Sequence, residues 1–398
     1  MAVTKNFDST ALSDGRDMFE LMQTTETNLL KERSKLFGKL KNEDISKITD
    51  LNQYLLDLSN KFTDMRKELI NNSRKAIQRT DRQAEILLNN ELTNAFKKGV
   101  DKTVKEADEV IGEIPETTPQ AELIKQRALN DIRQSQLNAL NSTLNDFTQV
   151  SGLVIGAVFT SRNLGQKKTL YDIVDQEQRK FNAKGITGKQ AGNREISLTS
   201  YNETVVRENS QQIMLQGTGA VETPHDRVYV SQHASASDAC RPHQGKYYID
   251  DVFRQGKRGK YTNLPLLSSV VDKKGRPGLF HFNCRHTVTY APEGFDPVGA
   301  PDDAKTNKNG RVNEAKAKQT YQVEQKQRAL QRNIRQYKQV KANALTEQER
   351  SRADGLVKDN QARLRQLEQF AKKNNIPFYR QSNKENIEFK FETFKPEF

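Results

Sequence analysis

A run of apolar residues in the first quarter of the chain limits the folds that the chain can adopt. Between positions 48 and 69 the apolar residues follow one another at intervals of three and four, with charged residues between them. Intervals that average 3.5 residues place these side chains along one face of an α-helix, and such a face needs a partner helix. The residues of this seam are Ile48, Leu51, Leu55, Leu58, Phe62, Met65 and Leu69. We therefore expect long helices packed against one another.

Helical periodicity continues after this seam to about Ile111. The stretch Gly112–Pro119 (GEIPETTP) contains two prolines and is predicted to interrupt the helix. A second helical block is predicted from Ala121 to about Phe147.

The region between 184 and 220 is more polar. The Gly-rich, basic stretch 184–196 contains neither a GxxxxGK[ST] phosphate loop nor a GxGxxG motif, and it is predicted to be a loop. A polar helix is expected from Ser197 to Gln216, with Gly217 and Gly219 as its C-terminal stop signals.

The sequence then changes to short β-prone segments separated by glycine and proline. Arg227–Gln232 alternates like a strand, Lys246–Ile249 is rich in β-formers, and Thr287–Tyr290 is a third short strand. This part of the chain is expected to form a small mixed α/β module.

All five histidines and both cysteines of the 398 residues lie within this module, between positions 225 and 290. Cys240 and His243 form a CxxH pair, and Cys284 and His286 form a CxH pair. Thiolate and imidazole are the ligands that zinc prefers, and two such pairs supply a tetrahedral site. The sequence therefore indicates a zinc site made of Cys240, His243, Cys284 and His286.

Other interpretations of this cluster stay open at the level of sequence. The histidines also fit interior residues that fix loops through hydrogen bonds, with the cysteines as small buried apolar groups. The cysteines also fit a disulfide formed after the protein leaves a reducing cytoplasm. A Cys/His pair can act as nucleophile and base, but no third orienting acid and no oxyanion loop is recognisable. The sequence therefore predicts no enzyme.

The charge of the chain is basic and uneven. The formal net charge is +13, and residues 301–398 contribute 22 Lys/Arg against 13 Asp/Glu. A basic helix with an apolar face is predicted here, and such a patch attracts polyanions, nucleic acid first, by releasing counterions. The alternative is a solvated helix face that only aids solubility. The residues expected to contact DNA are Lys326, Arg328, Arg332, Arg335, Lys338 and Lys341.

The remaining signals concern the end of the chain and the membrane. Thr346–Glu349 has the form of a capping box that starts another helix, and Ile387, Phe389 and Phe391 alternate like a terminal strand.

The longest apolar run, Val150–Phe159, is far shorter than the ~20 residues of a spanning helix. No signal-peptide pattern is present, so assembly is expected to begin in a cytoplasm.

The order of motifs in residues 170–340 resembles the minor capsid, or head morphogenesis, proteins of tailed phages that infect Gram-positive bacteria. A helix running into Gly-Thr-Gly is followed by a strand that ends at His233, by Arg-Pro-His-Gln-Gly-Lys-Tyr, by Asn-Cys-Arg-His and by a Gln/Arg-rich helix. These elements occupy 202–219, 228–233, 241–247, 283–286 and 325–335, with Gly278 and Leu279 before the fourth. The family pattern has a tryptophan beside Gln-Gly, which this chain lacks. Cys240 is not part of that pattern, which makes His233 an alternative ligand.

The resemblance implies a structural virion protein, assembled in the host cytoplasm, that sits near the portal vertex of the phage head. Its implied partners are portal and capsid proteins and packaged DNA, with several copies around the portal, and its implied role is head assembly, DNA packaging or DNA delivery. A metal-dependent nuclease or Cys/His hydrolase carried in the virion is the alternative.

The expected fold is predominantly α with a small mixed α/β module. Three regions are expected: a helical docking region over 1–165, the Cys/His-containing module over 166–300, and a basic helical tail with a terminal strand over 301–398.

Overall fold

The computed structural model describes residues 15–107, 109–233, 236–254, 263–273, 278–281, 284–292, 294, 313–376 and 378. The elements in chain order are α2 (Arg16–Phe37), η2 (Ile45–Lys47), α3 (Leu51–Glu106), α4 (Pro119–Asn163), α5 (Leu170–Lys184), β1 (Thr187–Ala191), β2 (Arg194–Ser197), α6 (Leu198–Ala220), β3 (Arg227–Val230), β4 (Tyr247–Ile249), η3 (Leu267–Ser269), β5 (Val288–Tyr290), α7 (Glu314–Asn343) and α8 (Glu347–Lys373).

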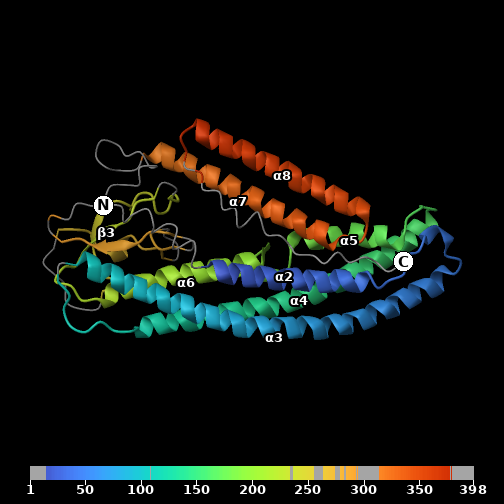
Figure 1. Cartoon of the computed structure of the whole chain (residues 1–398), viewed down its shortest axis with the longest axis horizontal. Helices are drawn as coiled ribbons and strands as arrows, with labels where there is room; N and C mark the ends of the chain where they lie inside the picture. The colour runs from blue at the N-terminus through green and yellow to red at the C-terminus, as the bar shows by residue number, and fades with distance from the viewer. Residues whose placement is uncertain are drawn as a thin grey trace.

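The molecule is elongated (Figure 1). Helices α2, α3, α4 and α6 lie side by side in a bundle, the strands β3, β4 and β5 lie at one end of it, and the hairpin of α7 and α8 lies obliquely across it. The predicted fold class, predominantly α with a small mixed α/β module, is confirmed. Within the described residues no helix is long and apolar enough to cross a membrane. The terminal strand predicted at Ile387, Phe389 and Phe391 lies outside the described residues.

The apolar seam predicted between 48 and 69 belongs to a buried face of α3. Leu58, Phe62 and Leu69 are buried in one hydrophobic core with residues of α2, α4 and α5. The ring of Phe62 meets Phe37 of α2 and Phe147 of α4 edge-on, with centroid distances of 5.9 and 6.3 Å. Burying a Leu or Phe side chain stabilises a fold by about 1.5–3 kcal/mol relative to leaving it exposed, so this face holds α3 in the bundle.

The predicted break is confirmed, and the second helix is longer than predicted. Thr118 begins α4 by accepting a hydrogen bond from the backbone N–H of Ala121 at 3.1 Å, and Pro119 follows as the first helical residue. The helix continues past Phe147 to Asn163. The apolar run that follows Phe147 extends it, because Val150, Val154 and Val158 recur every four residues on the buried face.

The prediction of a loop over 184–196 is wrong, because this stretch forms an antiparallel hairpin of β1 and β2. Gly192 and Asn193 connect the strands, and Gly192 has a φ of +58°, which glycine adopts without steric cost. The hairpin is attached to α4 by side chains. Asn138 donates to the carbonyl of Gly188 at 3.0 Å, and the N–H of Thr187 donates to Ser142 Oγ at 3.1 Å.

The prediction that Gly217 and Gly219 stop their helix is also wrong, because α6 continues through both to Ala220. These glycines allow close packing instead. A Cβ added at Gly217 would lie 2.2 Å from the carbonyl oxygen of Phe96, and one at Gly99 of α3 would lie 2.0 Å from that of Met214. Helices α3 and α6 therefore touch backbone to backbone.

We expect Gly217→Ala to destabilise the protein, because its methyl group has no room against the backbone of α3. The expected loss in the free energy of unfolding is about 1–3 kcal/mol, as for other overpacked sites. Denaturant unfolding followed by circular dichroism measures it.

The matched control is Gly156→Ala in α4, where an added Cβ meets nothing within 4 Å. Replacing a mid-helix glycine by alanine there should stabilise the protein by about 0.5–1 kcal/mol. Equal effects of the two substitutions would contradict the close crossing.

The three strands predicted in the module are confirmed. They form an antiparallel sheet in the order β4-β3-β5, with Val228 of β3 opposite both Tyr248 and Tyr290. The sheet covers a small core that contains Val228, Val230, Leu267 and Leu279 together with both cysteines. The bundle holds the module in place, because Lys102 of α3 donates to the carbonyl of Val288 at 2.9 Å.

The C-terminal helices form a hairpin attached to α5. Thr346 Oγ accepts from the N–H of Glu349 at 3.3 Å, which confirms the predicted start of α8. The Glu349 carboxylate binds Arg179 of α5 and Arg352 instead of returning to the cap. Asp175 of α5 accepts from the backbone N–H of Thr346 at 2.7 Å, which anchors the turn.

Candidate metal centre

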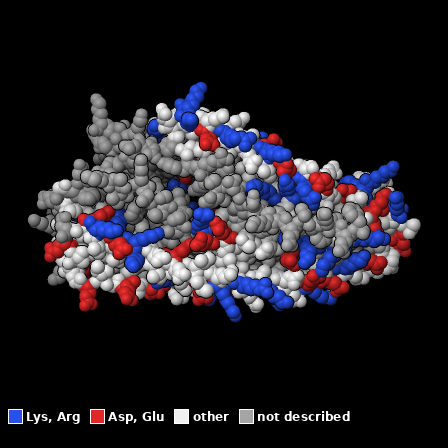
Figure 2. Space-filling model, in the orientation of Figure 1, with Lys and Arg blue, Asp and Glu red and all other residues white. Residues whose placement is uncertain are grey.

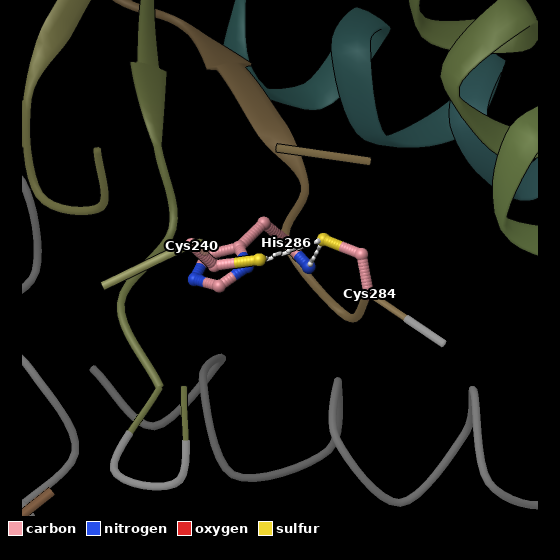
Figure 3. A group of neighbouring side chains, drawn as sticks. All are labelled: Cys240, Cys284 and His286. Atoms are coloured by element: carbon pink, nitrogen blue, oxygen red, sulfur yellow. Dashed lines mark hydrogen bonds between the residues drawn. The ribbon is translucent and has the colours of Figure 1, made fainter. Parts of the chain in front are cut away.

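Three of the predicted ligands meet in the core of the module. The sulfurs of Cys240 and Cys284 lie 3.7 Å apart, and the Cys284 sulfur lies 3.3 Å from Nδ1 of His286. Cys240 comes from the turn after β3, whereas Cys284 and His286 come from the segment that leads into β5 (Figure 3). All three side chains are buried, and their ligand atoms lie within 4.8 Å of one another.

His243 and His233 are placed differently. His243 lies in the same turn as Cys240, but it is not one of the three residues whose ligand atoms converge. Its backbone carbonyl accepts from the hydroxyl of Tyr248 at 3.2 Å. The ring of His233 lies edge-on to that of His286 with centroids 4.7 Å apart, and its Nε2 lies 3.1 Å from Ser231 Oγ. His233 therefore borders the cluster, and its Nε2 bonds to a serine.

The backbone around Cys284 favours a negatively charged sulfur. The N–H groups of Phe280 and His286 both donate to Cys284 Sγ, at 3.2 and 3.4 Å. Phe280 has a φ of +61°, an unusual conformation for a non-glycine residue, in the turn that carries this donor. The bond from Cys240 lowers the pKa of Cys284, and the same contact together with burial raises the pKa of Cys240. Within the pair, these effects favour the proton on Cys240 and negative charge on Cys284.

The tautomer of His286 follows from its neighbour Gln244. Gln244 Oε1 accepts from the backbone N–H of His233 at 2.8 Å, so this atom is the oxygen of the amide. Nε2 of His286 lies 3.1 Å from the same oxygen and must therefore carry the proton. Burial lowers the pKa of His286, which keeps the ring neutral. The lone pair of Nδ1 then faces Cys284.

These distances fit a tetrahedral zinc ion. Zinc bonds of about 2.3 Å to sulfur and 2.0–2.1 Å to nitrogen place two sulfur ligands about 3.8 Å apart, and a sulfur and a nitrogen about 3.6 Å apart. The observed separations are 3.7 and 3.3 Å. A disulfide requires about 2.05 Å between the sulfurs, so both cysteines are free in this structure. These two separations are close to those of a zinc site, and Gln244 orients the imidazole from behind.

Sequence reasoning missed the role of Gln244. Glutamine is rarely a metal ligand. Gln244 acts instead on the ring of His286, and its amide is oriented by the backbone N–H of His233, eleven residues away. The signal was present in the Gln-Gly-Lys-Tyr motif, where Gly245 adopts a φ of +67° and packs on Gln232. The first residue of the Asn-Cys-Arg-His motif, Asn283, lies outside the described residues.

The six basic residues predicted to contact DNA lie in different environments along α7. Lys326 and Arg332 are exposed. Arg328 pairs with Glu324, and Lys341 pairs with Asp354 of α8 at 2.5 Å. The guanidinium of Arg335 lies over the ring of Phe19 in α2, 5.4 Å from its centroid, and Lys338 is half-buried. Figure 2 shows blue side chains over the α7–α8 hairpin, with acidic ones among them.

The structure combines a long helical bundle with a small sheet-containing module that carries the Cys/His cluster. This architecture agrees with the phage minor capsid class indicated by the order of motifs. A comparison with protein families matches residues 12–373 to phage minor capsid protein 2. Because the match covers most of the chain, the protein belongs to the phage minor capsid protein 2 family. The resemblance to phage minor capsid proteins is thereby confirmed, and the protein is a structural component of a phage particle.

Neither the curated proteins nor the solved structures include a match to this chain.

Proposed function

We propose that this minor capsid protein lies at the portal vertex of the phage head, where it contacts portal and capsid subunits and the packaged DNA. The family match over residues 12–373 carries this proposal. The architecture supports it, because the long bundle offers docking surface along its length and the hairpin of α7 and α8 carries exposed basic residues such as Lys326 and Arg332. We keep the three proposed regions, a docking region over 1–165, the module over 166–300 and the tail over 301–398, with α5 and α6 of the second region packed into the cores of the bundle.

If the protein occupies the portal vertex, lysines of the bundle should cross-link to the portal protein in purified phage heads. Lys61 and Lys67 on the exposed side of α3 suit this test, because both are accessible. Cross-linking followed by mass spectrometry of intact particles identifies the partner. A protein absent from mature particles and from portal-containing precursors would rule the proposal out.

We also propose that the cluster of Cys240, Cys284 and His286 binds one structural Zn²⁺. A metal would link the turn after β3 to the segment that leads into β5. The two cysteines in these segments are 44 residues apart in sequence. The small core of this module gains stability from such a tie, because folding and metal binding are coupled. The backbone donors at Cys284 favour its thiolate, and the bond between Nε2 of His286 and Gln244 leaves the lone pair on Nδ1, as ligation requires.

Protein purified without chelator should contain one zinc per chain. His286→Ala should abolish metal binding because it removes the Nδ1 ligand, whereas His243→Ala should retain it because His243 lies outside the converging atoms. Elemental analysis by plasma mass spectrometry measures the ratio.

Circular dichroism of the same variants serves as the folding control, because the helical bundle has its own cores. A wild-type protein without zinc would exclude the metal. Equal loss of zinc from both histidine variants would show that the four-ligand set predicted from the sequence is correct and the three-ligand geometry is not.

The alternative, a metal-dependent nuclease or a Cys/His hydrolase, receives less support from the geometry. Cys284 and His286 are 6% and 2% exposed. A nucleophile and its base must reach an external substrate, and burial of this kind suits a structural centre better. We therefore assign the cluster a structural role.

A further inference from the structure

Two separate segments of the chain place arginines on one glutamate of α7, and an arginine of a third segment lies nearby. Arg285, which lies between the two ligands Cys284 and His286, donates to Oε1 of Glu324 at 2.6 Å. Arg328, one turn further along α7, donates to the same oxygen. Arg207 of α6 lies close enough to feel both guanidinium charges and pairs with Glu203 at 3.7 Å.

The cationic character extends along α7. Burial lowers the pKa of Arg207, and repulsion from Arg285 and Arg328 lowers it further. Partial desolvation of its guanidinium lowers the pKa of Arg332, and repulsion from Arg194 of β2 and from Arg328 lowers it further. Arg328 and Arg332 are one turn apart on α7 and lie on the same face of the helix. Together with Arg285 and Arg207 they form a band of arginines beside Glu324.

The band is accessible to a ligand. The side chains of Arg207, Arg285, Arg328 and Glu324 are 20%, 24%, 36% and 22% exposed, and Arg332 is an exposed residue. Two guanidinium groups share a single carboxylate oxygen, so one negative charge balances two positive charges. A guanidinium has five N–H donors in a planar fork that matches the oxygens of a phosphate.

We propose that Arg207, Arg285, Arg328 and Arg332 form a binding site for backbone phosphates of DNA, in which Glu324 is a built-in counter-ion that competes with phosphate. This inference rests on the proposed contact with packaged DNA and specifies the arginines that make that contact. It differs from the set predicted on α7 alone, because Arg207 and Arg285 come from α6 and from the metal module. Phosphate contacts of this kind bind without sequence preference.

The competition of Glu324 with phosphate gives the sharpest test. Glu324→Gln should tighten binding of a double-stranded oligonucleotide of mixed sequence by at least about threefold, because the variant removes the internal anion from the site. The matched control is Glu347→Gln, which changes the net charge equally on an exposed residue of α8 that pairs with Arg350. Fluorescence anisotropy at low and at physiological salt measures both.

A second pair of variants does not depend on Glu324. Arg328→Gln with Arg332→Gln should weaken binding and reduce the salt dependence of the affinity by about two phosphate contacts. The control is Arg363→Gln with Arg365→Gln, which removes two exposed charges from α8. Thermal unfolding of all variants shows whether they are folded.

The outcomes separate the two proposals. Wild-type protein that does not bind the oligonucleotide at low salt overturns the DNA contact and this site with it. If the wild type binds, but Glu324→Gln changes the affinity no more than Glu347→Gln and the two arginine pairs have equal effects, this site is overturned. The DNA contact itself is then retained. Tighter binding by Glu324→Gln only, with weaker binding by Arg328→Gln and Arg332→Gln, supports the site.

Discussion

The direct backbone contact between α3 and α6 is the constraint on which the rest of the structure depends. Gly99 and Gly217 remove the side chains that would hold the two helices apart. Because the helices cross so closely, Lys102 of α3 reaches the carbonyl of Val288, and Gln211 of α6 reaches that of His286 at 2.6 Å. The segment that carries two of the candidate metal ligands and leads into β5 is therefore positioned by a helix pair that contributes no ligand itself.

A buried carboxylate fixes the other side of the bundle. Glu26 of α2 accepts hydrogen bonds from the N–H of Ile186 before β1 and from the N–H and hydroxyl of Thr199 at the start of α6. Burial raises the pKa of Glu26, and these bonds partly offset the effect. A buried acceptor of this kind specifies geometry more than it adds stability, because its desolvation costs about as much as its bonds return. It orients the hairpin of β1 and β2 and the first turn of α6 with respect to α2.

The periodic signals of the sequence predicted much of this fold. The apolar seam of α3, the proline break, the three strands of the module and the Thr346 cap depend on residues close together in the chain, and all are found. The errors concern contacts between distant segments. In sequence Gly217 is typical of a helix stop, and only its contact with the backbone of Phe96 shows that it allows close packing. The Gly-Asn pair at 192–193 is typical of a hairpin turn, but it lies in a basic, Gly-rich stretch that was predicted to be a loop.

The candidate site shows the same division. The sequence placed Cys240, Cys284 and His286 in one module, but spacing alone also included His243 and gave no role to Gln244. Only the fold shows that the imidazole of His286 is oriented by that amide. The DNA contacts predicted from the sequence likewise lie on one helix, α7. The sequence could not show that Arg207 and Arg285 lie near Arg328 and Glu324 of that helix.

The length of α3 has a consequence for the geometry of assembly. A helix of 56 residues at a rise of 1.5 Å per residue is about 84 Å long. The Cys/His module lies beside its C-terminal part, while the aromatic core around Phe62 lies beside its N-terminal part. The length of α3 thus sets the separation between the two ends of the protein, and surfaces at these ends can be engaged at once only by neighbours separated by a comparable distance.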